Sequence, residues 1–201
     1  MENDEQEKEI VNPALKTIPV EKKKKPLWEF VRFAILSLLI VVPFRAFVAQ
    51  PFVVSGSSMV PTFQSGQYLI VDEISYRLRE PKRGEVIVFK PPKNPSVYYI
   101  KRIVGLPGET IKIEGKKIII KNDEYTEGFE LKEPYIKVEP PRNFEKTIPK
   151  GEYFVMGDNR GASSDSRSWG TLPKNLIIGR AYLRLFPLAE ASVLPGDYQD
   201  Y

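Results

Sequence analysis

Residues 98–108 read YYIKRIVGLPG, a run of aromatic and β-branched side chains that ends in a Gly-Leu-Pro-Gly turn signal. Tyrosine, isoleucine and valine favour strands, whereas proline and glycine favour turns. The same pattern recurs from Phe52 to about Pro187. The short apolar runs cover residues 68–71, 85–89, 98–104, 110–113, 117–120, 153–156 and 177–186. The sequence therefore predicts a mainly β domain.

Between these strands the sequence predicts few other elements. Glu114-Gly115-Lys116 is typical of a hairpin turn, and Ile74 to Arg79 is predicted to form one short helix before a proline. Residues 122–149 are polar and proline-rich. We therefore expect residues from about 110 to 150 to form a hairpin followed by an irregular excursion.

The composition excludes several kinds of active site. The 201 residues include no histidine and no cysteine, so a Ser-His-Asp triad, a Cys-His pair, a histidine-rich metal site and a disulfide are all impossible. The formal net charge is only +4, and the basic residues are dispersed except for the run 22–25. This balance does not favour nucleic acid as a partner.

The N-terminal region is predicted to anchor the chain in a membrane. Residues 1–26 are mostly polar and are interpreted as a tail, and residues 27–49 as a transmembrane helix whose uncharged centre runs from 33 to 44. Arginines near its two ends can extend their side chains to the lipid headgroups. A buried core helix does not account for the flanking lysines, and a cleaved signal peptide would need a small residue where Val48 stands. The positive-inside rule places the tail in the cytoplasm and residues 50–201 on the other side.

A stretch rich in serine directly follows the predicted anchor. Residues 53–62 read VVSGSSMVPT, and a serine that attacks a carbonyl needs a base. Without histidine, a lysine or a carboxylate must take the proton. Lys101 is a candidate because it lies on an otherwise apolar strand, where burial lowers a lysine pKa. Strand alternation by itself also permits Lys101 to point outward to solvent.

A third group of polar residues lies near the end of the chain. Residues 157–170 read GDNRGASSDSRSWG, a loop with two aspartates and two arginines. From these residues alone the loop fits a surface turn stiffened by Asp–Arg pairs, a phosphate-binding loop or a cation site.

Four blocks in order resemble the type I signal peptidases of bacteria. They are Ser-Met-x-Pro-Thr at 58–62, Arg-Gly-Glu-Val-Ile-Val-Phe at 83–89, Tyr-Ile-Lys-Arg-Ile-Val-Gly-Leu-Pro-Gly-Glu at 99–109, and the loop at 157–170. The resemblance extends from the anchor to about Phe186. It implies an antiparallel β domain after a single N-terminal transmembrane helix. It also implies a Ser–Lys dyad protease that removes signal peptides, with no cofactor and no metal.

The resemblance assigns roles to individual residues. Ser58 matches the nucleophile and Lys101 the general base. Ser163 matches a serine that orients the lysine amine, and the supporting ion pairs match Asp158, Asp165, Arg102 and Arg167. Some members of the family carry a hydroxyl at the position of Gly56, where it helps to hold the oxyanion. In this chain the oxyanion site is expected to depend on the Ser58 backbone N–H, with a contribution from Ser57 or a water.

The resemblance also implies how substrates bind. Shallow apolar pockets for small residues would be lined by Val54, Met59, Tyr99 and Ile100, and an extended substrate would pair with 52–55 and 98–100. Phe52 and Phe63 are candidates for an apolar surface that dips into the bilayer. The expected partners are preproteins that carry signal peptides, membrane lipid and, as neighbours, the export machinery. The expected location is the inner or plasma membrane, with the catalytic domain on the extracytoplasmic side.

Three other functions compete with this prediction. Self-cleaving repressor-type Ser–Lys proteases usually follow a DNA-binding helical domain, and nothing of that kind precedes Ser58. Penicillin-binding enzymes need a serine followed by lysine three residues later, which this sequence lacks. The third is an anchored non-catalytic β domain for binding or assembly, or an inactive relative.

Overall fold

The computed structural model describes residues 26–47, 49–136 and 142–198. The chain divides into two compact units, residues 1–40 and 41–201, which are described separately. The helix α1 (Pro26–Phe47) begins at a proline, which suits the first helical turn because that position needs no N–H donor. Its apolar side chains between residues 27 and 42 are mostly exposed. Within the described residues, no helix is long and apolar enough to cross a membrane.

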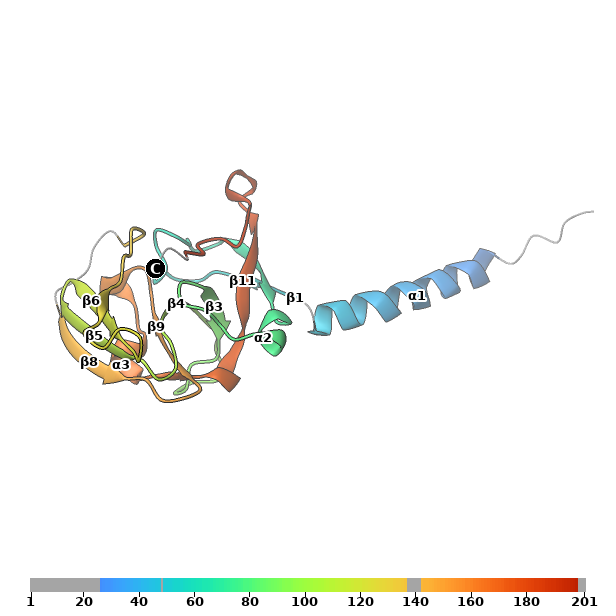
Figure 1. The fold of residues 1–201 in the computed structure, drawn as a ribbon. Coiled ribbons are helices and arrows are strands. Elements are labelled where there is room, and N and C mark those ends of the chain that lie inside the picture. Colours follow the sequence, from blue (N-terminus) through green and yellow to red (C-terminus); the bar gives the residue numbers. More distant parts are fainter. Residues whose placement is uncertain (1–25, 48, 137–141, 199–201) are drawn as a thin grey trace, which may run out of the picture. The chain divides into compact units, whose positions relative to one another are not determined.

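The larger sheet of the second unit consists of eight strands, and every pair is antiparallel (Figure 1). The order is β1-β2-β11-β3-β4-β9-β10, and β12 pairs with β11. These strands are β1 (Ala49–Val53), β2 (Tyr68–Asp72), β3 (Val86–Phe89), β4 (Tyr99–Gly105), β9 (Glu152–Met156), β10 (Leu172–Pro173), β11 (Ile177–Phe186) and β12 (Ser192–Val193). The mainly β fold predicted from the sequence is confirmed.

The smaller sheet consists of four antiparallel strands in the order β7-β6-β5-β8. Its members are β5 (Thr110–Gly115), β6 (Lys117–Lys121), β7 (Phe129–Glu130) and β8 (Arg142–Thr147). The β5–β6 hairpin turns where the sequence predicted it, with Glu114 opposite Lys117. The expectation of an irregular segment up to residue 149 was wrong for β7 and β8. A single aromatic residue, Phe144, packs on the core from β8, so the apolar signal was weak although the backbone pairs fully with β5.

Short helices connect the strands. They are α2 (Ser75–Leu78), α3 (Ser166–Trp169) and the 3₁₀ turns η1 (Arg160–Ala162), η2 (Lys174–Leu176) and η3 (Leu188–Glu190). The predicted helix at 74–79 corresponds to α2. Asp165 caps α3 by accepting a hydrogen bond from the Arg167 backbone N–H, which satisfies one of the free donors of the first turn.

Three clusters of buried side chains form the core. One fills the smaller sheet, one lies between β3, β4 and β9, and the third lies under the loop between β1 and β2. This third cluster contains Val54, Met59, Phe63, Leu69, Val86 and Ala181. Burying a side chain of the size of Phe63 contributes about 2–3 kcal/mol. The cluster therefore fixes both ends of the loop that carries the serines.

Phe63 corrects one prediction. We expected its ring on an exposed apolar surface, but it is fully buried in this cluster, and the Arg184 guanidinium lies 5.5 Å from the ring centre. The Phe63 backbone N–H also donates to the Met59 carbonyl at 2.9 Å. Phe52 is half-buried and meets the Tyr98 ring edge-on, with 5.1 Å between the ring centres.

Candidate active site

Ser58 lies in the loop that joins β1 to β2. Hydrogen bonds from Val54 N to Gln67 O and from Gly66 N to Val54 O, both 2.9 Å, close the base of this loop. Gly56 has φ +92°, a conformation that favours glycine. Next to Ser58, the Met59 side chain is buried in the core. The chain is thus fixed on both sides of a half-buried serine.

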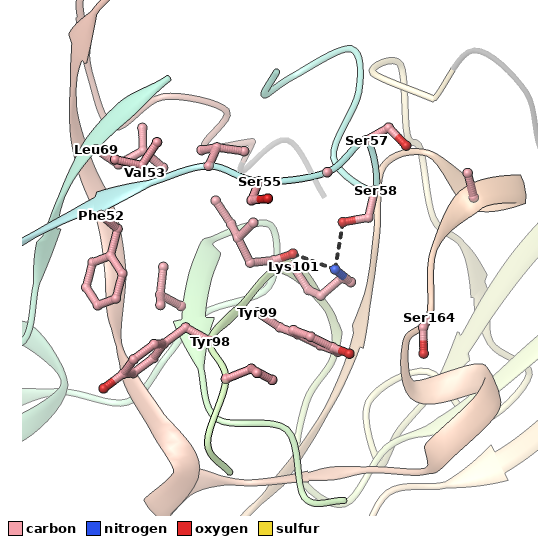
Figure 2. Close-up of a pocket in the computed structure, with 16 residues that line it drawn as sticks. Phe52, Val53, Ser55, Ser57, Ser58, Leu69, Tyr98, Tyr99, Lys101 and Ser164 are labelled. Carbon is pink, nitrogen blue, oxygen red and sulfur yellow. Dashed lines mark hydrogen bonds between the residues drawn. The ribbon is translucent and has the colours of Figure 1, made fainter. Parts of the chain in front are cut away.

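Lys101 reaches the same place from β4. Its residue surface is only 3% exposed, and its Nζ lies 2.8 Å from Ser58 Oγ. Nζ also donates a 2.8 Å hydrogen bond to the Ile100 carbonyl, and the Tyr99 ring centre lies 5.2 Å away. Figure 2 shows both hydrogen bonds as dashed lines. The outward orientation of Lys101 that alternation permits is therefore not the one adopted.

The surroundings of Lys101 change its protonation. Burial lowers the pKa of the ammonium from 10.5 to about 8, against the opposing charges of Asp165 and Asp158. At pH 7 roughly a tenth of such lysines are neutral, compared with fewer than about one in a thousand for an exposed lysine. A neutral amine 2.8 Å from a hydroxyl can accept the proton of that hydroxyl.

Arg102 neutralises the first of the two aspartates. Because alternate residues of a strand point to opposite faces, Arg102 extends away from Lys101, where its Nε and Nη2 donate to the two Asp158 oxygens at 2.9 and 2.6 Å. Thr62 Oγ1 donates to Asp158 Oδ2 at 2.5 Å. Arg102 and Asp158 are both buried. Charge-assisted pairs of this two-pronged kind are strongly directional, so they fix β4 against the loop after β9.

Arg167 neutralises the second aspartate. Its Nε and Nη2 each donate to Asp165 at 2.8 Å, and the Gly157 backbone N–H donates to Asp165 at 3.1 Å. Burial opposes ionisation of Asp165, but the hydrogen bonds and charge of Arg167 outweigh it and lower the pKa of this carboxyl. The loop at 157–170 is therefore a turn stiffened by Asp–Arg pairs. Within the described ranges no group of acidic side chains is arranged to hold a metal ion.

Ser163 lies near the dyad but differs from the expectation. A Cβ added at Gly157 would collide with Ser163 Oγ and with the Ser58 carbonyl, so these three residues converge. Ser163 Oγ is buried and has no hydrogen-bond partner among the described residues. In the part of the chain that the structure describes, no hydrogen bond joins it to Lys101, whose Nζ bonds Ser58 and Ile100 instead. Gly157 itself was missed by the sequence reasoning, because only the packing shows that a side chain does not fit.

A cavity of about 530 Å³ opens beside the Ser58–Lys101 pair. Of the predicted lining residues, Val54, Tyr99 and Ile100 line it, whereas the Met59 side chain lies in the core cluster beneath. The sequence reasoning missed Leu69, Val88, Val97, Ala162 and Ser164. Leu69 and Val88 looked like ordinary core residues of their strands, and nothing in the alternation distinguished them.

The backbone around Ser58 leaves a donor unused. Within the described residues the Ser58 N–H makes no hydrogen bond, whereas the Ser58 carbonyl accepts one from Asn159 N at 3.0 Å. The Asn159 side-chain amide donates to the Ser57 carbonyl at 3.1 Å. Asn159 was not among the predicted site residues. Its two hydrogen bonds hold the turn around Ser58, while Gly56, which is exposed, offers no side chain.

Comparison with known proteins gives a consistent result. A family model described as "Signal peptidase, peptidase S26" matches residues 27–186. A probable signal peptidase I-2 of Synechocystis sp. is 36% identical over 88% of this chain and 83% of its own length. A signal peptidase I of Leptolyngbya laminosa is 37% identical over 88% of each chain. A crystal structure of a signal peptidase I from Enterococcus faecalis is 32% identical and covers 51% of this chain and 97% of its own, with a TM-score of 0.43.

Proposed function

The chain belongs to the signal peptidase family, and we propose that it is a membrane-bound serine endopeptidase that removes N-terminal signal peptides from exported preproteins. In this proposal Ser58 is the nucleophile and Lys101 is the general base. The 2.8 Å approach of a buried lysine amine to the Ser58 hydroxyl carries the proposal.

The reaction proceeds in two stages. Neutral Lys101 accepts the Ser58 proton while Oγ attacks the scissile carbonyl, and the resulting ammonium gives a proton to the leaving amine. Water then attacks the acyl-enzyme, with Lys101 again as base. In both stages the oxyanion accepts a hydrogen bond from the Ser58 N–H. Losing one such donor typically costs about 3 kcal/mol of transition-state stabilisation.

The substrate enters the cavity as an extended strand. The segments 52–55 and 98–100 border the cavity on two sides and offer main-chain hydrogen bonds to a peptide between them. Val54, Leu69, Val88 and Ile100 provide apolar walls. Walls of this kind accept alanine and exclude bulky side chains by overlap, which suits the small residues that precede a signal-peptide cleavage site.

The N-terminal region would place this site at a membrane. Residues 33–44 carry no charge, and the described apolar side chains of α1 are exposed, as they would be in contact with lipid. The lysines at 22–25 would then lie on the cytoplasmic side and the β unit on the extracytoplasmic side. The partners in this proposal are preproteins, membrane lipid and the neighbouring export machinery.

The test is cleavage of a precursor with an Ala-x-Ala site by the detergent-solubilised full chain. We expect one cut after the second alanine by the wild type, and a loss of about 10³-fold or more in kcat/KM for Ser58→Ala. Ser55→Ala is the matched control, since Ser55 lines the same cavity but its hydroxyl is not a partner of the Lys101 amine, which bonds Ser58 and Ile100. Undiminished processing by Ser58→Ala would overturn the dyad and favour a non-catalytic role.

A further inference from the structure

The last described segment of the chain lies against the back of the candidate site. The Gly196 carbonyl accepts a hydrogen bond from Arg102 Nη1. A Cβ added at Gly196 would lie 2.5 Å from Thr62 Cγ2 and 3.5 Å from Arg102 Nη2. Arg102 and Thr62 both hydrogen-bond Asp158 through their side chains. This segment lies beyond residues 27–186, which the family model matches.

A second contact connects the same segment to the loop of Asp158. The Tyr198 and Tyr135 rings meet edge-on with 5.5 Å between their centres, and the Tyr135 ring centre lies 3.9 Å from the Arg102 guanidinium carbon. The Tyr135 hydroxyl donates to Glu133 at 2.8 Å. Glu133 pairs with Arg160 at 2.5 Å, and Arg160 Nε donates to the Gly157 carbonyl, next to Asp158, at 3.1 Å.

The backbone holds this segment in place before it reaches Arg102. Val193 of β12 pairs with Leu183 of β11, and Leu194 N donates to the Tyr182 carbonyl at 2.7 Å. Leu194 and Gly196 both have positive φ, at +48° and +77°, so the chain turns sharply just after the sheet. The turn brings the Gly196 carbonyl to the arginine at a spacing that only glycine permits.

We infer that residues 194–198 are a positioning segment for the proposed reaction: they hold Arg102 against Asp158 and thereby fix the two chain segments that carry Lys101 and Ser58. Arg102 follows Lys101 in β4, and Asp158 precedes Asn159, whose N–H binds the Ser58 carbonyl. A shift of the Arg102–Asp158 pair therefore moves the amine and the hydroxyl relative to each other. The inference rests on the proposed function, because it needs Lys101 to act as the base.

The contact between the Gly196 carbonyl and Arg102 also affects the charge around the Lys101 amine. Asp165 and Asp158 are the carboxylates that act on Lys101, and they are countered by Arg167 and Arg102. If Arg102 loosens, the Asp158 charge is less compensated and water enters beside it. Both changes raise the pKa of Lys101 and reduce the neutral fraction at pH 7.

The experiment compares three forms of the full chain in detergent with one precursor substrate. The first ends at Leu194, which removes the Gly196 carbonyl and Tyr198. The matched control ends at Tyr198 and keeps every contact named above. The third is Gly196→Ala in the full-length chain, whose Cβ would meet Thr62. Each form is measured for kcat, KM, the pH dependence of kcat/KM and the thermal unfolding midpoint.

We expect the chain that ends at Leu194 and Gly196→Ala to lose about tenfold to 100-fold in kcat with KM within about twofold. In both forms the rise of kcat/KM with pH (the acid limb of the profile) should move to higher pH. The control that ends at Tyr198 should match the wild type. Wild-type kcat together with an unmoved acid limb in both forms would overturn the inference. A loss that only follows the folded fraction, with an unmoved acid limb, would also overturn it by indicating a merely structural role. Ser58→Ala distinguishes a failure of this inference from a failure of the proposed function: if Ser58→Ala still cleaves, the proposed function itself fails.

Discussion

Two strands that follow each other in the chain but belong to different sheets, β4 and β5, each carry a lysine among apolar residues, and the two lysines have opposite surroundings. Lys101 on β4 is 3% exposed, and its amine bonds a hydroxyl and a carbonyl. The Lys112 side chain on β5 is 34% exposed and pairs with Glu114 at 2.6 Å. Burial lowers the pKa of Lys101 to about 8, whereas the hydrogen bond and charge of Glu114 raise the pKa of Lys112.

The difference shows what makes a lysine a usable base. Burial lowers the pKa of a lysine, but a nearby carboxylate without a counter-charge raises that pKa again. Near Lys101 each carboxylate is occupied by an arginine, Asp158 by Arg102 and Asp165 by Arg167. Lys112, in contrast, faces a carboxylate that it pairs with directly. A strand position alone therefore does not distinguish a base from a solvated charge.

The largest expected effect comes from removing each lysine in turn. Lys101→Ala should lower kcat/KM for an Ala-x-Ala precursor by about 10³-fold or more, because among the described residues Lys101 is the group that hydrogen-bonds the Ser58 hydroxyl. Lys112→Ala, the matched control from β5, should leave the rate within about twofold. Steady-state cleavage by both variants measures this. Equal losses would show that the comparison between the two strands is irrelevant to catalysis.

The next effect is on stability. Below pH 8 the buried ammonium costs free energy, and the separation between 10.5 and about 8 corresponds to at most about 3 kcal/mol. Lys101→Met should therefore raise the free energy of unfolding at pH 7 while abolishing cleavage. Between pH 8 and pH 10.5 the unfolded chain binds more protons than the folded one. The wild type gains stability over this range, and the advantage of the variant disappears.

Denaturant unfolding of both proteins at pH 7 and pH 10 measures this difference. Lys112→Met is the control and should bring no such gain. A Lys101→Met protein that is less stable than the wild type at pH 7 would contradict the idea that burial, rather than a special bond, lowers the pKa of Lys101.

A smaller effect is the pH dependence of the wild type. In the proposed mechanism the neutral amine is the active form, so kcat/KM should rise as the pH increases through about 8. From pH 7 to pH 9 the neutral fraction grows from roughly 0.1 to 0.9, a gain of about tenfold. Initial rates in buffers of constant ionic strength measure it. A profile that is flat from pH 6 to pH 10 would remove Lys101 as the titrating base.

The sequence predicted the β class and most strands of the larger sheet because their apolar runs are long and end at glycine or proline. The resemblance to type I signal peptidases, rather than any strand pattern, led us to expect Ser58, Lys101 and the aspartates and arginines of a supporting ion-pair set in one site. The sequence did not predict β8, whose apolar content is a single ring, Phe144. The inward position of Phe63 and the close approach at Gly157 depend on packing between distant segments, which no local pattern encodes.

The smallest expected effect concerns the pair on β5. Glu114→Gln removes the carboxylate that raises the pKa of Lys112. Exposed ion pairs contribute little to stability, so the unfolding midpoint should stay within error. The acid limb of cleavage should also stay at pH 8, because Glu114 is not among the charges that act on Lys101.

Asp158→Asn is the contrasting variant: it removes a carboxylate that does act on Lys101 and leaves Arg102 buried without its carboxylate. Its unfolding midpoint should fall, and any active fraction should show an acid limb below pH 8. If Glu114→Gln shifted the acid limb as Asp158→Asn does, the two lysines would share one electrostatic environment, and the contrast between β4 and β5 would fail.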